Sequence, residues 1–176
     1  MLTCALSPCA FAADDAPTAE YQIKAAFLCK FGNYVEWPGT EASTGRIRDR
    51  PFEIGVVATE AFFQMVKSAA AGQTVDGRPI AVRRLQRDDT LKDLDLMFVA
   101  RSSEGLGIEL LLASKGLPIL TVTETLAATD VRGMVNFLVI DDKVKFDIQV
   151  PPAAAAHLRI SSRLLSLAHN VTGRAS

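Results

Sequence analysis

Between residues 52 and 124, short apolar segments alternate with amphipathic ones, and this alternation constrains the fold more than any other feature of the chain. The segment 94–100, LDLMFVA, is apolar enough to be buried on both faces of a sheet. Strand–helix–strand units place parallel strands in one sheet with helices packed on its faces. The predicted strands are 52–58, 80–85, 94–100 and 118–124, and the predicted helices are 59–72 and 104–116.

The end of the chain has a different pattern. The segments 133–140 and 144–150 are separated only by Asp141-Asp142-Lys143, which predicts an antiparallel hairpin. Apolar and polar residues alternate along 144–150, as expected for a strand near a sheet edge with one solvated face. The fold class is therefore α/β: a three-layer α/β/α sandwich with a mostly parallel mixed sheet of about six strands and a C-terminal antiparallel hairpin. Ser161 or Ser162 is expected to cap a final helix.

An N-terminal helix is predicted to end at Trp37-Pro38-Gly39, because proline disfavours helical geometry at the residue before it. Its core face is expected to consist of Ile23, Phe27, Phe31 and Val35, which recur at helical spacing. Tyr34 and Trp37, near its end, are candidates either for closing the core or for binding a protein partner. A tryptophan beside a proline is rarely buried completely, so we expect its rim to be exposed. Cys29 is expected to be a buried small hydrophobe.

Composition limits the class of protein. A 176-residue chain with a net charge of −1 has one sizeable core and no field that would hold nucleic acid. No apolar window is long enough to span a membrane. Ala10-Phe11-Ala12 fits a signal-peptidase site, so residues 1–12 are expected to be a signal peptide truncated at its start. Residues 13–20 would then be a disordered mature N-terminus, and 21–172 a single domain. Cleavage would leave Cys29 as the sole cysteine, so no internal disulfide can form.

No catalytic constellation is recognisable, and the chain is not expected to be an enzyme or to hold a metal or cofactor. His157 and His169 have no metal-ligand spacing, and there is no P-loop, nucleophile elbow or paired-carboxylate motif. Residues 105–110 form a partial dinucleotide fingerprint, but Leu110 occupies the third glycine position. Seven arginines are expected to form a solvated rim, since aspartates are interleaved with them: Arg46, Arg48, Arg50, Arg78, Arg83, Arg84 and Arg87.

The start of the helix after the strand 94–100 is the best candidate for a ligand site. Ser102 and Ser103 begin this helix, whose free N–H groups suit a small anion, and Arg101 would strengthen the site if it points inward. Asn136 lies inside an apolar strand, where a buried amide must be hydrogen-bonded. It either pins a loop or lines a pocket beside Ser102, and the structural role is favoured.

Several strings, in this order, make the chain closely similar to the YfiR family of small periplasmic proteins. They are KAAFLCKFGNYVEWP (24–38), FEIGVVA (52–58), GRPIAVRRL (77–85), GMVNFLVIDDKVKFDI (133–148) and LRISSRLLSLA (158–168). The similarity covers about 21–171, and the pair of GMVNF and ISSRLL is its most specific part.

The resemblance implies a periplasmic α/β sandwich that represses a membrane-bound diguanylate cyclase, or a related sensor, by binding its periplasmic domain. In the best-known systems an outer-membrane lipoprotein relieves the repression, and a homodimer is a further assembly to consider. Many members carry a cysteine just before the third strand, where this chain has Leu94-Asp95-Leu96, so their redox sensitivity is not carried over. The alternative function is a periplasmic sensor of a small anion in another signalling system, with Arg101, Ser102, Ser103 and Asn136 at the ligand.

Overall fold

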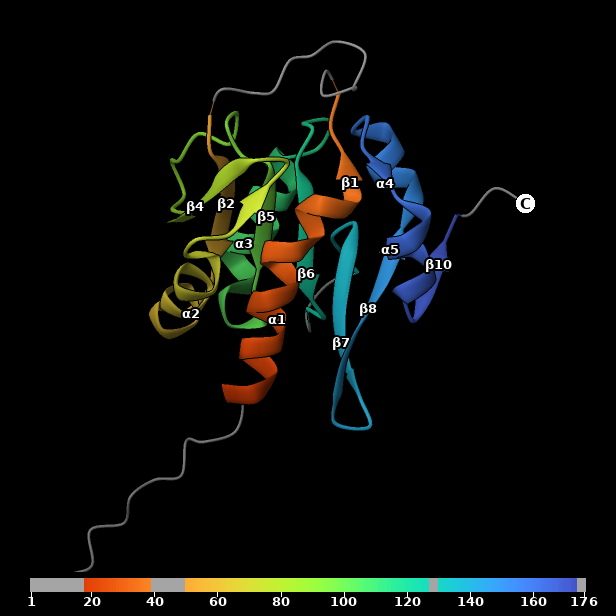
Figure 1. Ribbon diagram of the computed structural model, residues 1–176, viewed down its shortest axis with the longest axis horizontal. Coiled ribbons are helices and arrows are strands. Elements are labelled where there is room, and N and C mark those ends of the chain that lie inside the picture. Colours follow the sequence, from red (N-terminus) through yellow and green to blue (C-terminus); the bar gives the residue numbers. More distant parts are fainter. Residues whose placement is uncertain (1–17, 39–49, 127–129, 174–176) are drawn as a thin grey trace, which may run out of the picture.

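A mixed, mostly parallel sheet forms the centre of the computed structural model, which describes residues 18–38, 50–126 and 130–173. Its strand order is β10-β8-β7-β6-β5-β2-β4-β3 (Figure 1). All pairs from β4 to β7 are parallel, and β7 and β8 form the predicted antiparallel hairpin. The strands are β2 Phe52–Val57, β3 Thr74–Val75, β4 Arg78–Arg84, β5 Leu96–Val99, β6 Leu120–Glu124, β7 Val135–Ile140, β8 Lys143–Gln149 and β10 Asn170–Thr172.

Helices cover both faces of this sheet and confirm the α/β sandwich. In Figure 1, α1 and α2 lie in front of the sheet and α3 lies behind it. Two of the helices have side-chain caps. The Thr59 hydroxyl accepts the Phe62 N–H ahead of α2, and Ser161, one of the two predicted caps, accepts the Leu164 N–H ahead of α5. The helices are α1 Thr18–Phe31, α2 Glu60–Ala70, α3 Glu104–Ala113, α4 Val150–Ala155 and α5 Ser162–Leu167, with short 3-10 turns η1 Gly32–Tyr34 and η2 Arg101–Ser103.

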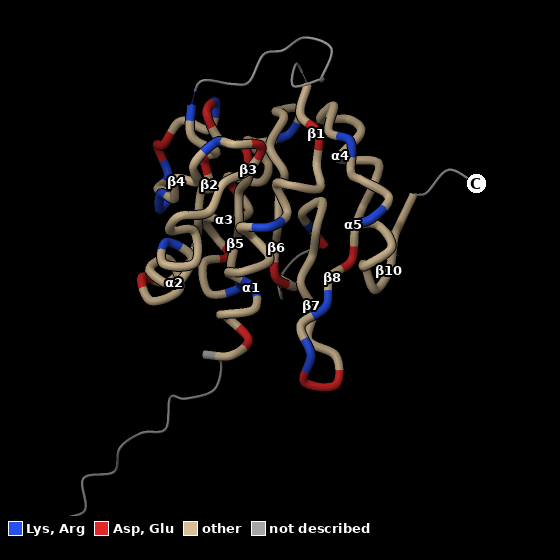
Figure 2. Tube along the Cα trace, viewed as in Figure 1, with Lys and Arg blue, Asp and Glu red and all other residues tan. Residues whose placement is uncertain are grey.

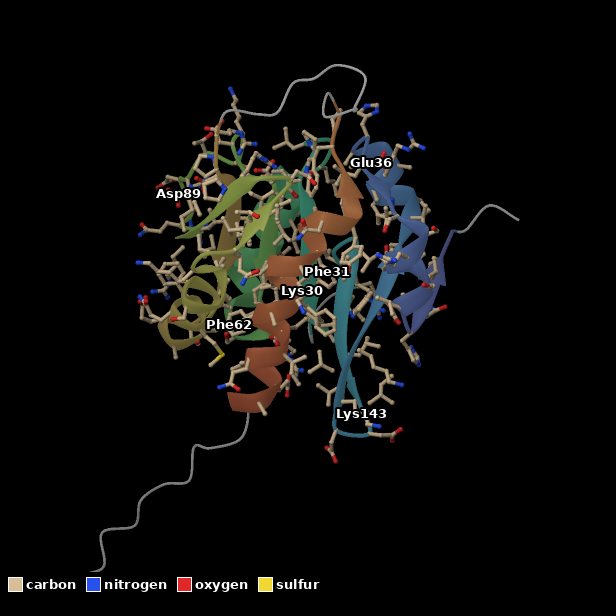
Figure 3. The ribbon with its side chains drawn as sticks, viewed as in Figure 1. Lys30, Phe31, Glu36, Phe62, Asp89 and Lys143 are labelled. Atoms are coloured by element: carbon tan, nitrogen blue, oxygen red, sulfur yellow. The ribbon has the colours of Figure 1, made fainter. Side chains whose placement is uncertain are left out.

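Side-chain alternation along the strands divides the core into two parts. The larger part packs under α1 and α2, and the smaller part lies under α3. Phe31 of α1 stacks on Phe137 with ring centroids 5.8 Å apart and meets Phe146 edge-on at 5.3 Å. Phe62 brings α2 into the same core by packing on Phe98 of β5 at 5.0 Å (Figure 3). Aromatic contacts of this kind fix the two front helices on the sheet.

The short strands differ from expectation. The strand β8 lies near the edge of the sheet, as predicted, but the edge itself is the three-residue strand β10, which pairs with β8 in parallel and was not predicted. The strand β3 pairs with β4 through a two-residue turn at Asp76 and Gly77, both with positive φ. A separate two-stranded sheet joins β1 Val35–Glu36 to β9 Arg159–Ile160. Strands of two or three residues are too short to show an alternation of apolar and polar side chains. Whether such a segment forms a strand therefore depends on its pairing with a distant part of the chain.

The first helix corrects three sequence predictions. It ends at Phe31 rather than at Trp37, and the 3-10 turn η1 and the strand β1 follow it. At Gly32 the chain runs so close to the sheet that a Cβ would lie 2.8 Å from Val75. Residues 18–20 form its first turn, so the predicted disorder of residues 13–20 is wrong for them, and residues 13–17 lie outside the described residues. Ile23 is 45% exposed and is not part of the core. The face turned to the sheet instead carries Lys24.

Candidate functional site at the carboxyl ends of the strands

The carboxyl ends of β2 and β5 are where a sheet of this type usually binds ligands. These neighbouring strands continue in opposite directions, β2 through α2 to β4 and β5 through α3 to β6. Such a divergence leaves a crevice outside the strand ends, flanked by helix N-termini. The predicted ligand residues of η2 follow β5 directly at this end of the sheet. The predicted ligand residues of η2 therefore lie at the end of the sheet where folds of this type usually bind ligands.

A buried ion pair, which the sequence analysis missed, lies beside the turn η2. Lys24 of α1 is 2% exposed and Glu124, at the end of β6, is 5% exposed. The Lys24 ammonium donates to a carboxylate oxygen of Glu124 and also to one of Glu20. The other oxygen of Glu124 accepts the backbone N–H of Arg101 at 2.8 Å. One carboxylate thus joins α1, β6 and the turn η2.

This arrangement bears directly on the predicted anion site. Arg101 is the first residue of η2, and its N–H already donates to the carboxylate of Glu124. A helix start attracts anions through such N–H groups, so the chain supplies its own anion at this point. The side chains of Arg101 and Ser102 are exposed, and that of Ser103 is half-buried and makes no capping hydrogen bond. Their role in ligand binding stays a prediction.

Tyr21 completes the cluster around Glu124. The Lys24 ammonium lies 5.5 Å from the centre of its ring. Burial raises the pKa of the Tyr21 phenol, and the negative charge of Glu124 raises it further. The phenol is therefore neutral at physiological pH, and Tyr21 packs beside the ion pair rather than acting as a base.

Asn136 pins a loop, which is the structural one of its two predicted roles. Its amide oxygen accepts the Thr123 hydroxyl at 2.9 Å, and its amide nitrogen donates to Thr125 at 3.3 Å. The Thr123 hydroxyl in turn accepts the Gly133 N–H at 3.0 Å. These bonds hold the connection between β6 and β7 against the sheet. Among the described residues, no hydrogen bond joins Asn136 to the turn η2.

Gly133 explains why this part of the GMVNF string needs a glycine. A Cβ at this position would lie 2.7 Å from the backbone oxygen of Thr121. Real side chains do not tolerate so short a contact with backbone, so a larger residue would push the connection off β6. The string thus encodes a close approach of loop to strand.

The two aromatic partner-binding candidates lie in different environments. Trp37 follows β1 and is 3% exposed, and its ring meets Phe52 edge-on at 5.4 Å. The expectation that its rim is exposed is therefore wrong. Tyr34 is half-buried, and its backbone oxygen accepts the Ser161 N–H at 2.9 Å. Of the two, Tyr34 has the surface that a partner could contact.

A second buried charge corrects the interpretation of the arginines. Asp95 is completely buried, and its carboxylate accepts hydrogen bonds from both terminal nitrogens of Arg50, at 2.8 and 2.9 Å. It also accepts Arg78 at 3.3 Å and the Glu53 N–H at 3.0 Å. Arg78 is itself buried, so Arg50 and Arg78 stabilise the amino end of the sheet and are not a solvated rim. Elsewhere acidic and basic residues are interleaved along the trace (Figure 2). Arg46 and Arg48 lie outside the described residues.

Cys29 is buried, as predicted, and burial raises the pKa of its thiol to about 11. The thiolate is the reactive form, and at pH 8 this pKa leaves about a hundredth of the thiolate present at the ordinary value of 9.0. Cys29 is therefore a packing residue and is unsuited to nucleophilic or redox chemistry.

We expect iodoacetamide to leave Cys29 unmodified in folded protein that begins at Ala13, and to modify it completely in urea. Burial removes both access and thiolate, so mass spectrometry after timed quenching should show the contrast. Reductant should leave the thermal midpoint of the same monomer unchanged. Rapid alkylation without denaturant, or a fall of the midpoint on reduction, would contradict the assignment.

No three residues among His, Cys, Asp and Glu of the described ranges gather as metal ligands. None of the helices described is both long enough and apolar enough to cross a bilayer. His157 and His169 are exposed, and His169 lies 3.2 Å from the carboxylate of Asp147.

Comparison with known proteins agrees with the strings quoted above. No curated protein matches the chain significantly. The family model described as YfiR/HmsC-like matches residues 21–169. The match runs from the first turns of α1 to the residue before β10 and includes every buried charge described here. The chain therefore belongs to the YfiR/HmsC-like family.

Proposed function

We propose that the protein is a non-catalytic periplasmic regulator that binds the periplasmic domain of a membrane-bound diguanylate cyclase and represses synthesis of cyclic di-GMP. The family match over residues 21–169 carries the proposal, because YfiR/HmsC-like domains are regulators of cyclic-di-GMP signalling. Such domains are periplasmic and generally act with a membrane cyclase as partner. The negative sign of the regulation, the direct contact and any relieving lipoprotein are parts of the proposal.

The polar groups of the core also support a regulator rather than an enzyme. Glu124, Asp95 and Asn136 are buried groups of types that can serve chemistry, and each is hydrogen-bonded to other parts of the chain. Catalytic groups need free lone pairs or protons that face a substrate. In the described part of the chain, these three groups instead make hydrogen bonds that join helices and loops to the sheet.

The contact with the partner is proposed to include Tyr34. It is partly exposed beside the small sheet of β1 and β9, where Glu36 and Arg159 lie 3.7 Å apart and are both well exposed. Tyrosine is enriched among the anchor residues of protein interfaces. Figure 3 places Glu36 at one end of the molecule and Lys143, at the tip of the β7–β8 hairpin, at the other.

The alternative, a sensor of a small anion held by Arg101, Ser102 and Ser103, has weaker physical support. The exposed side chains of Arg101 and Ser102 favour it, but the Glu124 carboxylate already accepts the Arg101 N–H and would repel a second anion. Asn136 is committed to Thr123 and Thr125. We therefore prefer the partner-binding function.

Deletion of the gene in its own host should raise cellular cyclic di-GMP about fivefold or more, a typical lower value for allosteric coupling. Mass spectrometry of nucleotide extracts measures the change. Expression of the chain in the periplasm should restore the low level, and expression of residues 13–176 in the cytoplasm should not. An unchanged level in the deletion strain would refute the repressor function, and rescue from the cytoplasm would refute the periplasmic contact.

A further inference from the structure

A cavity of about 310 Å³ lies on the face of the sheet opposite α1, far along the strands from Glu124. It is bounded by the end of α3, the beginning of β6, the segment before β7, and α4. Its lining consists mostly of apolar and small residues, with two cations: Leu111, Ser114, Lys115, Gly116, Thr121, Val131, Arg132, Met134, Pro152 and Ala155. No function considered above uses it.

The charge of this cavity has one sign. Lys115 and Arg132 are exposed, and neither makes an ion pair within the described part of the chain. No aspartate or glutamate is among its described lining residues. Elsewhere on this protein the arginines commonly meet carboxylates, as Arg84 meets Glu60 and Arg87 meets Glu109. Two exposed cations with no internal ion pair beside one hollow are the feature to which an anion would bind.

The interior of the cavity suits an apolar body with one polar contact. Leu111, Thr121 and Met134 are buried wall residues. The Ser114 hydroxyl donates to the Leu111 oxygen at 2.9 Å, so that donor is used. The Thr121 hydroxyl accepts the Met134 N–H at 3.0 Å, which leaves its own proton to donate. Buried polar groups are costly when unpaired, so a ligand acceptor near Thr121 would gain from this proton.

The walls are held in place without a ligand. The close approach of Gly133 to Thr121 fixes the segment before β7 against β6. The Gln149 N–H donates to the Met134 oxygen at 2.8 Å and ties the same segment to the end of β8. Sites that bind small molecules are usually preformed in this way, and 310 Å³ is at the small end of their size range.

We propose that this cavity binds a small amphiphilic carboxylate, with its aliphatic chain between Leu111 and Met134 and its carboxylate at Lys115 and Arg132. The volume of 310 Å³ corresponds to about ten waters at roughly 30 Å³ each, which limits the ligand to about ten non-hydrogen atoms. Arginine binds carboxylates through paired N–H groups, and lysine adds a point charge. This ligand class is independent of the contact with a cyclase, because Tyr34 is not part of the cavity.

Octanoate, with ten non-hydrogen atoms, is the probe, and 1-octanol is its uncharged counterpart. Titration of the isotope-labelled protein followed by NMR should shift the amide signals of Thr121, Met134 and Gly116 with octanoate. Octanol should bind about tenfold more weakly, since the charge-assisted contacts are missing. Equal affinity for both compounds, or octanoate shifts confined to residues outside the cavity, would overturn the proposal.

The double variant Lys115→Gln/Arg132→Gln should lose about tenfold or more in octanoate affinity while its octanol affinity stays unchanged. Both side chains are exposed, so the variant should fold, and its denaturant midpoint checks this. Lys143→Gln removes a cation at the far hairpin tip and should leave octanoate binding unchanged. Equal losses in Lys143→Gln and the double variant would mean non-specific charge attraction and would refute the site. Retained affinity in a folded double variant would do the same.

Discussion

Replacement of Lys24 by methionine should lower the free energy of unfolding by about 3–5 kcal/mol, the cost of breaking a buried ion pair from one side. Methionine keeps an unbranched apolar stem but leaves the carboxylate of Glu124 buried with no counter-charge. Glu124 would retain only the hydrogen bond from the Arg101 N–H. Urea denaturation at pH 7, with two-state fits, gives the difference.

The control for this change lies on the same helix. Lys30 is exposed on α1, so Lys30→Met should alter stability by no more than about 0.5 kcal/mol (Figure 3). The double variant Lys24→Met/Glu124→Gln should recover most of the loss, because glutamine is neutral and can still accept the Arg101 N–H. Two results would show that the pair does not hold α1 to the sheet. One is a loss of unfolding free energy in Lys24→Met no larger than in Lys30→Met. The other is a loss in the double variant larger than the sum of the losses in its two single variants.

The long elements of this fold could be predicted because their signals are local. Residues 96–99 are all apolar and form the central strand β5, and the hydroxyl of Thr59 caps the start of α2. The two-residue strands β1 and β9 could not be predicted, since each exists only through pairing with the other across more than half of the described chain. The position of β10 beside β8 depends on tertiary packing in the same way.

Most of the polar interior was beyond sequence reasoning for a different reason. A buried lysine or aspartate is recognisable only through its partner, and Lys24 and Glu124 are 100 positions apart. A signal did exist: Lys24 holds a helical position between Tyr21 and Leu28, where the core face requires a buried residue. Asn136 was predictable, because an amide inside an apolar strand must find partners in any fold.

Buried charges lie at both ends of the sheet. At the carboxyl end, Glu124 pairs with Lys24 and accepts the Arg101 N–H, and at the amino end Asp95 pairs with Arg50 and Arg78. In both clusters the carboxylate is paired with cations of the same chain, so these buried charges join helices and loops to the sheet.

Truncation of Trp37 to alanine should cost about 3–5 kcal/mol of stability, as the loss of a large buried aromatic does. The ring is 3% exposed and rests edge-on against Phe52, which leads into β2 at the centre of the sheet. The protein that remains folded should bind the proposed partner, the periplasmic domain of a diguanylate cyclase, with unchanged affinity, because a buried indole has almost no surface to offer. Denaturant midpoints and calorimetric binding on the same sample separate the two effects.

Tyr34→Ala is the matched comparison, and the opposite result is expected. Its side chain is only partly buried, so the stability loss should be smaller than for Trp37→Ala, whereas the affinity for the proposed cyclase domain should fall by about 2 kcal/mol. If Trp37→Ala weakens binding while the denaturant midpoint holds, the indole must turn outward when the partner binds. If neither variant affects binding, the interface lies away from β1 and β9. Trp37 and Tyr34 lie three positions apart, but the Trp37 ring is buried and the Tyr34 side chain is partly exposed. Comparing the two alanine variants therefore separates a packing role from a role in partner binding.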